Sequence, residues 1–123
     1  MAFGLTSATA GFYLAANTWT QVFLAGTGTG SANLIIQVTL NLCNDINDGN
    51  PIYATIARTP TGITTSGAID ATLHIVENLR PIYPYPSQEF ARLVYTGERL
   101  WVKADRAGLI VQPSGIPSFM PPA

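Results

Sequence analysis

The strongest constraint on the fold is the stretch from Asn33 to Cys43, in which apolar and polar residues alternate. Every second position is aliphatic: Leu34, Ile36, Val38, Leu40 and Leu42. Most positions between them hold uncharged polar residues: Asn33, Gln37, Thr39 and Asn41. Successive side chains of a β-strand point to opposite faces, whereas a helix would scatter these aliphatic residues around its surface. The stretch therefore predicts a long β-strand with one apolar face and one polar face.

Shorter segments with a similar alternation predict further strands. They lie at residues 12–14, 19–24, 52–57, 69–76, 90–95, 100–104 and 109–111, and stretches rich in Gly, Pro, Asn and Asp separate them. No segment shows the apolar spacing of an amphipathic helix. We therefore predict an all-β protein, an antiparallel β-sandwich or jelly roll of seven to nine short strands with extended termini.

The 123 residues are expected to form one folded domain. We divide the chain into an N-terminal arm (1–10), a β-sandwich domain (11–115) and a Pro-rich C-terminal tail (116–123). The Gly-rich segment 26–30 is expected to join its flanking strands as an antiparallel pair, and the turn at 105–108 to close a second hairpin. Segment 80–87 contains three prolines, which predict a sheet edge or a crossing between sheets.

The distribution of charge predicts self-association. Charged residues make up 11% of the chain, against about a quarter in ordinary proteins, and none precedes Asp45. A free surface normally carries charge, so we expect a second copy to cover part of this one; a surface coated with Thr, Ser, Asn and Gly is the alternative. The expected interface residues are Phe3, Leu5, Phe12, Gln37, Thr39, Tyr83, Tyr85, Phe119 and Met120.

Several classes of function are not expected. The net charge of −1 and the dispersed basic residues disfavour nucleic acid, and no apolar run reaches the roughly 20 residues of a membrane span. His74 is the only histidine and Cys43 the only cysteine, so an ordinary zinc site is not expected. A calcium loop of the EF-hand type starting at Asp45 fails at Asn50 and Ile56. We predict no enzyme activity, no catalytic residue, no metal and no cofactor.

The segment from Gly97 to Val111, closing on Gly115, resembles a hairpin near the end of small virion proteins of tailed phages. Its sequence has a glycine turn, an apolar strand, the turn Ala104-Asp105-Arg106-Ala107-Gly108 and a return strand. The order of strands is similar from Phe12 to Gly115, including a Thr-rich strand at Trp19 to Leu24 and a long strand that ends at Asn41 to Asn44.

This resemblance implies a non-enzymatic structural protein of the virion. The leading expectation is a capsid decoration or cement protein, a homotrimer that binds the major capsid protein on the capsid surface. A protein of the tail, baseplate or fibre is the alternative within this class. The alternative from another class is a carbohydrate-binding module, with Tyr83, Tyr85, Trp101 and the Asp45 to Asn50 loop as its site.

Overall fold

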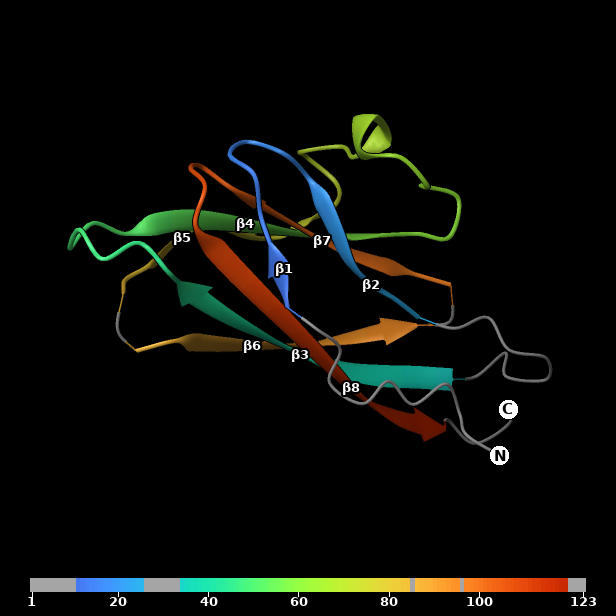
Figure 1. Cartoon of the computed structure of the whole chain (residues 1–123). Coiled ribbons are helices and arrows are strands. Elements are labelled where there is room, and N and C mark those ends of the chain that lie inside the picture. Colours follow the sequence, from blue (N-terminus) through green and yellow to red (C-terminus); the bar gives the residue numbers. More distant parts are fainter. Residues whose placement is uncertain (1–10, 26–33, 85, 96, 120–123) are drawn as a thin grey trace.

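The computed structural model describes residues 11–25, 34–84, 86–95 and 97–119, which form eight β-strands and one short 3-10 helix (Figure 1). The strands are β1 (Phe12–Tyr13), β2 (Thr20–Leu24), β3 (Leu34–Asn44), β4 (Ile52–Thr59), β5 (Ile75–Ile82), β6 (Gln88–Tyr95), β7 (Arg99–Ala104) and β8 (Leu109–Phe119). The 3-10 helix, η1, spans Ser66–Ala68. The prediction of an all-β fold is confirmed.

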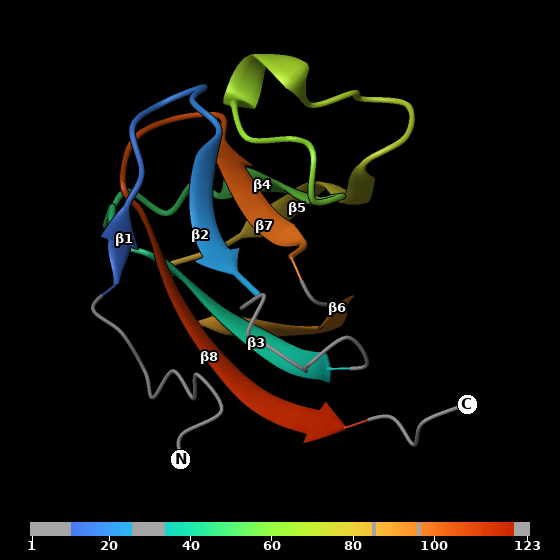
Figure 2. The same ribbon diagram turned by 90° about the vertical axis from the view of Figure 1, so that its right-hand side faces the viewer.

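The strands form two antiparallel sheets that pack face to face (Figure 2). Sheet A has the order β1-β8-β3-β6, and sheet B has the order β2-β7-β4-β5. Strand β3 pairs with β8 along its whole length, from Leu34 opposite Phe119 to Asn44 opposite Leu109. The predicted antiparallel β-sandwich is therefore present, with the longest predicted strand inside sheet A.

The core lies between the two sheets, and β3 supplies its apolar face as predicted. Val38, Leu40 and Leu42 are fully buried and Ile36 is nearly so. Gln37, on the opposite face, is exposed. Sheet B contributes the facing layer of buried aliphatic residues: Ile52, Ala54, Ile56, Leu100, Val102 and Ala104. Alternation along the strands thus decides which side chains are buried. Their burial stabilises the fold by roughly 25 cal/mol per Å² of apolar surface.

Both predicted local pairings are wrong, because the connections concerned cross between the sheets. Strand β2 belongs to sheet B and β3 to sheet A, and likewise β7 belongs to sheet B and β8 to sheet A. Residues of the turn at 105–108 form hydrogen bonds with other parts of the chain and do not close a hairpin. Asp105 exchanges bonds with Tyr53 in β4, and Gly108 O accepts the Asp45 N–H at 2.9 Å.

The predicted strand at 69–76 is also wrong: β5 begins only at Ile75, and residues 61–73 form turns and η1. Here side chains, instead of a neighbouring strand, form hydrogen bonds with the backbone groups. Asp70 Oδ1 accepts bonds from the Thr72 N–H at 2.8 Å and the Thr72 hydroxyl at 2.7 Å. The Asp70 N–H donates to Nδ1 of His74 at 2.9 Å, which closes the turn.

The proline-containing segments lie at sheet edges. Strand β5, which includes Pro81, is the edge of sheet B, and the chain then crosses to β6 in sheet A, as predicted. Strand β8 continues to Phe119, so residues 116–119 belong to the sandwich rather than to a tail. Beyond Val111, β8 pairs only with β3 among the described residues, and an open side tolerates the missing N–H of Pro113 and Pro117. The predicted arm, 1–10, lies outside the described residues.

Candidate functional site

The predicted interface residues are dispersed over the molecule. Gln37 and Thr39 lie together on the outer face of sheet A, Tyr83 is exposed after β5, and Phe12 packs against the core. Phe119 ends β8. The remaining residues lie outside the described part of the chain: Phe3, Leu5, Tyr85 and Met120. Among the expected interface residues that the structure describes, Gln37 and Thr39 are therefore the two that share one surface.

That surface, which we term face A, is the outer side of strands β3, β6 and β8. Its residues come from positions that alternate with the buried ones: Gln37, Thr39, Asn41, Cys43, Glu89, Ala91, Leu93, Tyr95, Ile110, Gln112 and Ser114. Glu89 is the one charged residue among them. Arg92 has the opposite orientation and donates to Glu77 Oε2 of β5 at 3.0 Å. Most of face A is therefore uncharged.

Large apolar side chains on face A are exposed to solvent. Leu93 is 50% exposed and Tyr95 is 45% exposed, and Tyr13 of the adjoining β1 is 60% exposed. Leu93 lies directly opposite Gln37 in the β3–β6 ladder. Leu93 and Tyr95 are not among the expected interface residues, although the alternation in 90–95 identifies them once Phe90 and Val94 are assigned to the core.

Asn41 adds an unsatisfied polar atom to face A. Its Oδ1 is shielded from solvent and has no hydrogen-bond partner in the described structure. Asn41 lies between Glu89 and Gln112 in the register of the sheet. A shielded acceptor without a donor costs about 1–3 kcal/mol.

Tyr83 and Trp101, the two aromatic residues proposed for carbohydrate binding that the structure describes, do not form a platform. Trp101 is buried, with 5% of its surface exposed, and its Nε1–H donates to Thr59 Oγ1 at 2.9 Å. Tyr83 is exposed, and Tyr85 lies outside the described residues. Trp101 points outward from sheet B but is covered, so its indole face is not available to a sugar. The assignment of Trp101 to a binding surface is therefore wrong.

The Asp45 to Asn50 loop is held by a cation of the protein itself. Arg106 donates to both carboxylate oxygens of Asp48, at 2.8 and 3.0 Å, and to the Asn50 carbonyl at 3.0 Å. These bonds, with that from the Asn50 N–H, hold the pKa of Asp48 below its usual range. No group of three His, Cys, Asp or Glu side chains with metal-binding geometry occurs in the described ranges. These hydrogen bonds thus join the Asp45 to Asn50 loop to the 105–108 turn.

His74 also has a structural contact, the bond from the Asp70 N–H to its Nδ1. Hydrogen bonds from Thr72 lower the pKa of Asp70.

No helix among the described residues is long and apolar enough to cross a membrane.

The chain matches no protein family model, no curated protein and no solved structure. A functional assignment therefore depends on the residues and the geometry described above.

Proposed function

We propose that this protein is a non-enzymatic structural protein of a tailed-phage virion, a capsid decoration protein that assembles as a homotrimer. The observation that carries the proposal is face A, a broad and nearly uncharged sheet surface with exposed Leu93 and Tyr95. In this proposal, face A of one subunit packs against a neighbouring subunit. The trimer then adheres to the major capsid protein and stabilises the head.

Face A is large enough to form more than half of a typical interface. Strands β3 and β8 have 11 residues each. At about 3.3 Å per residue and about 4.8 Å between strands, these two strands and the 8 residues of β6 cover roughly 480 Å². Specific interfaces bury roughly 800 Å² on each partner. In a closed three-fold ring, face A would meet a different surface of the next subunit, because only two-fold contacts join identical patches.

The connectivity of the sandwich supports the same proposal. Strands β1 and β8, β2 and β7, β3 and β6, and β4 and β5 are neighbours. These pairings are those of a long hairpin rolled into two sheets, which supports a jelly roll. Jelly rolls are common in viral capsid proteins and also occur in lectins, so the fold favours the proposed class without selecting it alone. The sequence resemblance of Gly97–Gly115 to phage virion proteins favours the virion class, although in this chain the segment crosses from sheet B to sheet A instead of forming a hairpin.

Replacing Thr39 with glutamate should weaken self-association at least tenfold, about 1.4 kcal/mol. Thr39 lies between Ala91 and Ser114 in the middle of face A, so a carboxylate there would be buried without a partner. Sedimentation velocity at micromolar concentration measures the effect. Thr64→Glu, at an exposed position in the 60–74 loop, is the matched control and should assemble as wild type.

A wild-type protein that is monomeric at micromolar concentration would overturn the proposed assembly, as would equal assembly of the two glutamate variants. A stable dimer would overturn the three-fold part alone. Circular dichroism of both variants shows whether the fold is retained.

Immunogold electron microscopy of virions tests the location. We expect labels at regular positions over the head, because a decoration protein repeats with the capsid lattice. Labels confined to the tail would contradict a decoration role and favour the tail, baseplate or fibre class. Absence from purified virions, measured by mass spectrometry, would contradict both.

A further inference from the structure

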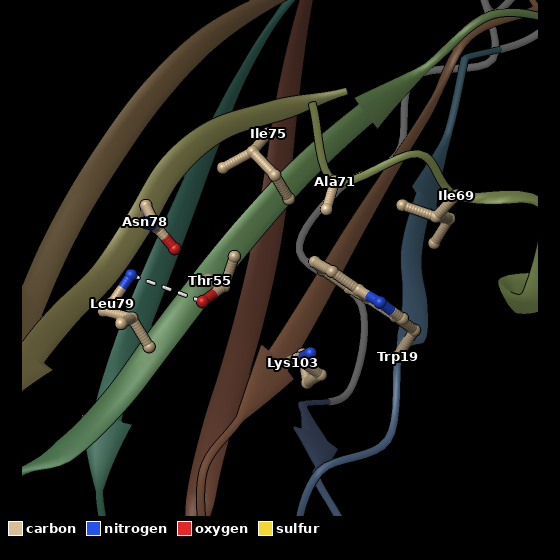
Figure 3. Close-up of a pocket in the computed structure, with 8 residues that line it drawn as sticks. All are labelled: Trp19, Thr55, Ile69, Ala71, Ile75, Asn78, Leu79 and Lys103. Atoms are coloured by element: carbon tan, nitrogen blue, oxygen red, sulfur yellow. Dashed lines mark hydrogen bonds between the residues drawn. The ribbon is translucent and has the colours of Figure 1, made fainter. Parts of the chain in front are cut away.

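A second surface, on the outside of sheet B, contains a pocket of about 420 Å³ (Figure 3). We term it the Trp19 pocket. It is lined by Trp19, Thr55, Ile69, Ala71, Ile75, Asn78, Leu79 and Lys103. Pockets for small ligands typically enclose 300–1,000 Å³. The Trp19 pocket lies on the opposite sheet from face A.

Three parts of the chain build the pocket. The floor is the outer side of sheet B, with Thr55 on β4 and Lys103 on β7 in paired positions. One wall is the indole of Trp19, which precedes β2. Ile69 and Ala71 in the loop before β5 lie on the same side as Trp19, and Asn78 and Leu79 of β5 lie across the pocket from it (Figure 3). The Asp70 turn, fixed by Thr72 and His74, holds that loop in place.

The lining combines an apolar body with one cation. Trp19 and four aliphatic residues line the pocket together with the Asn78 amide and the Thr55 hydroxyl. Lys103 is the one charged residue of the lining, and its Nζ lies 5.0 Å from the centre of the Trp19 ring. No carboxylate of the described residues forms an ion pair with Lys103. The pocket therefore offers an uncompensated positive charge beside apolar surface.

The backbone at the pocket is strained. Leu79 has φ of 48°, which is unfavourable for a residue with a branched side chain. The β4–β5 register shifts between Ala54 and Ile56, and the Leu79 N–H bonds to Thr55 Oγ1 at 3.3 Å. Irregular strands and strained residues concentrate at functional sites. Leu79 is itself one of the residues that line the pocket.

We propose that the Trp19 pocket binds a small carboxylic acid with an apolar or aromatic body. The ligand's carboxylate pairs with the ammonium of Lys103, whose flexible stem lets it move from the indole face toward the acid. The body packs against Trp19, Ile75 and Leu79. The Asn78 amide lies at the pocket and provides a hydrogen bond to the acid or to a substituent.

The two tryptophans provide an internal control for a binding experiment. The probe is 3-phenylpropionate, titrated into ¹⁵N-labelled full-length protein while the two indole N–H signals are followed by NMR. The Trp19 signal should shift and saturate, whereas the buried Trp101 signal should remain in place. The neutral isostere 3-phenylpropanamide and the hydrophilic acid glucuronate should each bind about tenfold or more weakly, since each lacks one of the two features.

Variants at Lys103 separate charge from shape. Lys103→Met should weaken the binding of 3-phenylpropionate about tenfold, and Lys103→Arg, which keeps the charge, should remain within about threefold of wild type. Unchanged amide signals elsewhere show that both variants fold.

Three results would overturn the proposal. The absence of a saturable Trp19 shift would mean that the pocket is not a site for these acids. Equal binding of the amide would remove the role of the charge. Glucuronate binding as tightly as 3-phenylpropionate would remove the role of the apolar body and favour a sugar site.

Discussion

Alanine at position 108 should lower the free energy of unfolding by about 3 kcal/mol or more. Gly108 has φ of +116°, which an L side chain rarely adopts and which costs about 1–3 kcal/mol. An added Cβ would also overlap the Ile46 side chain and lie 2.7 Å from its Cδ1. Overpacking of this kind costs about 1–3 kcal/mol more. Urea denaturation measures the sum.

Two other glycines separate these effects. Gly49 has φ of +80° with nothing within 4 Å of an added Cβ, so Gly49→Ala should cost about 1 kcal/mol for backbone strain alone. Gly62 has open space and no positive φ, so Gly62→Ala should be near neutral or slightly stabilising. Equal losses at positions 108 and 49 would contradict the close contact with Ile46.

Replacing Asn44 with alanine should cost about 2–5 kcal/mol. Asn44 is 4% exposed at the end of β3, and all of its side-chain polar atoms are bonded. Its Nδ2 donates to Ile82 O at 2.9 Å and to Asn50 O at 3.0 Å, and its Oδ1 accepts the Ile46 N–H at 2.8 Å. Alanine would leave the Ile82 carbonyl and the Ile46 N–H without these partners, at about 1–3 kcal/mol each.

Asn47→Ala is the control for Asn44, since Asn47 is an exposed amide in the same loop and should change stability by less than about 0.5 kcal/mol. Asn44→Asp keeps the acceptor for Ile46 but removes the donor and introduces a charge, so it should be at least as destabilising as alanine. Thermal and urea unfolding provide both comparisons. A near-neutral Asn44→Ala would contradict the role of this side chain as the link between β3, β5 and the 45–50 loop.

The sequence predicted the class of the fold because alternation is local. In β3, the period of two residues placed Val38, Leu40 and Leu42 in the core before any partner strand was known. Pairing is not local. The neighbours of β3 are β6 and β8, which begin at Gln88 and Leu109, far along the chain. Gly-rich and Asp-rich turns have the same composition whether they close a hairpin or cross between sheets, so both hairpins were assigned wrongly.

The candidate surfaces were only partly predictable for the same reason. The lack of charge before Asp45 indicated the polar side of β3, but Leu93 joins Gln37 only through pairing with β6. Trp101 alternates outward like an exposed aromatic residue and is nevertheless buried, since its indole bonds to Thr59. The Trp19 pocket depends on an ordered loop whose Asp70 turn interrupts an alternating pattern.

The order of the strands also sets how the chain can fold. Each N-terminal strand has its partner in the C-terminal half: β1 pairs with β8, β2 with β7 and β3 with β6. Only β4 and β5 are adjacent both in the sequence and in a sheet. A nascent chain therefore exposes the apolar side of β3 until the ribosome has released almost the whole domain. Such non-local topologies fold in milliseconds to seconds. Until then, strands without their partners can aggregate or bind chaperones.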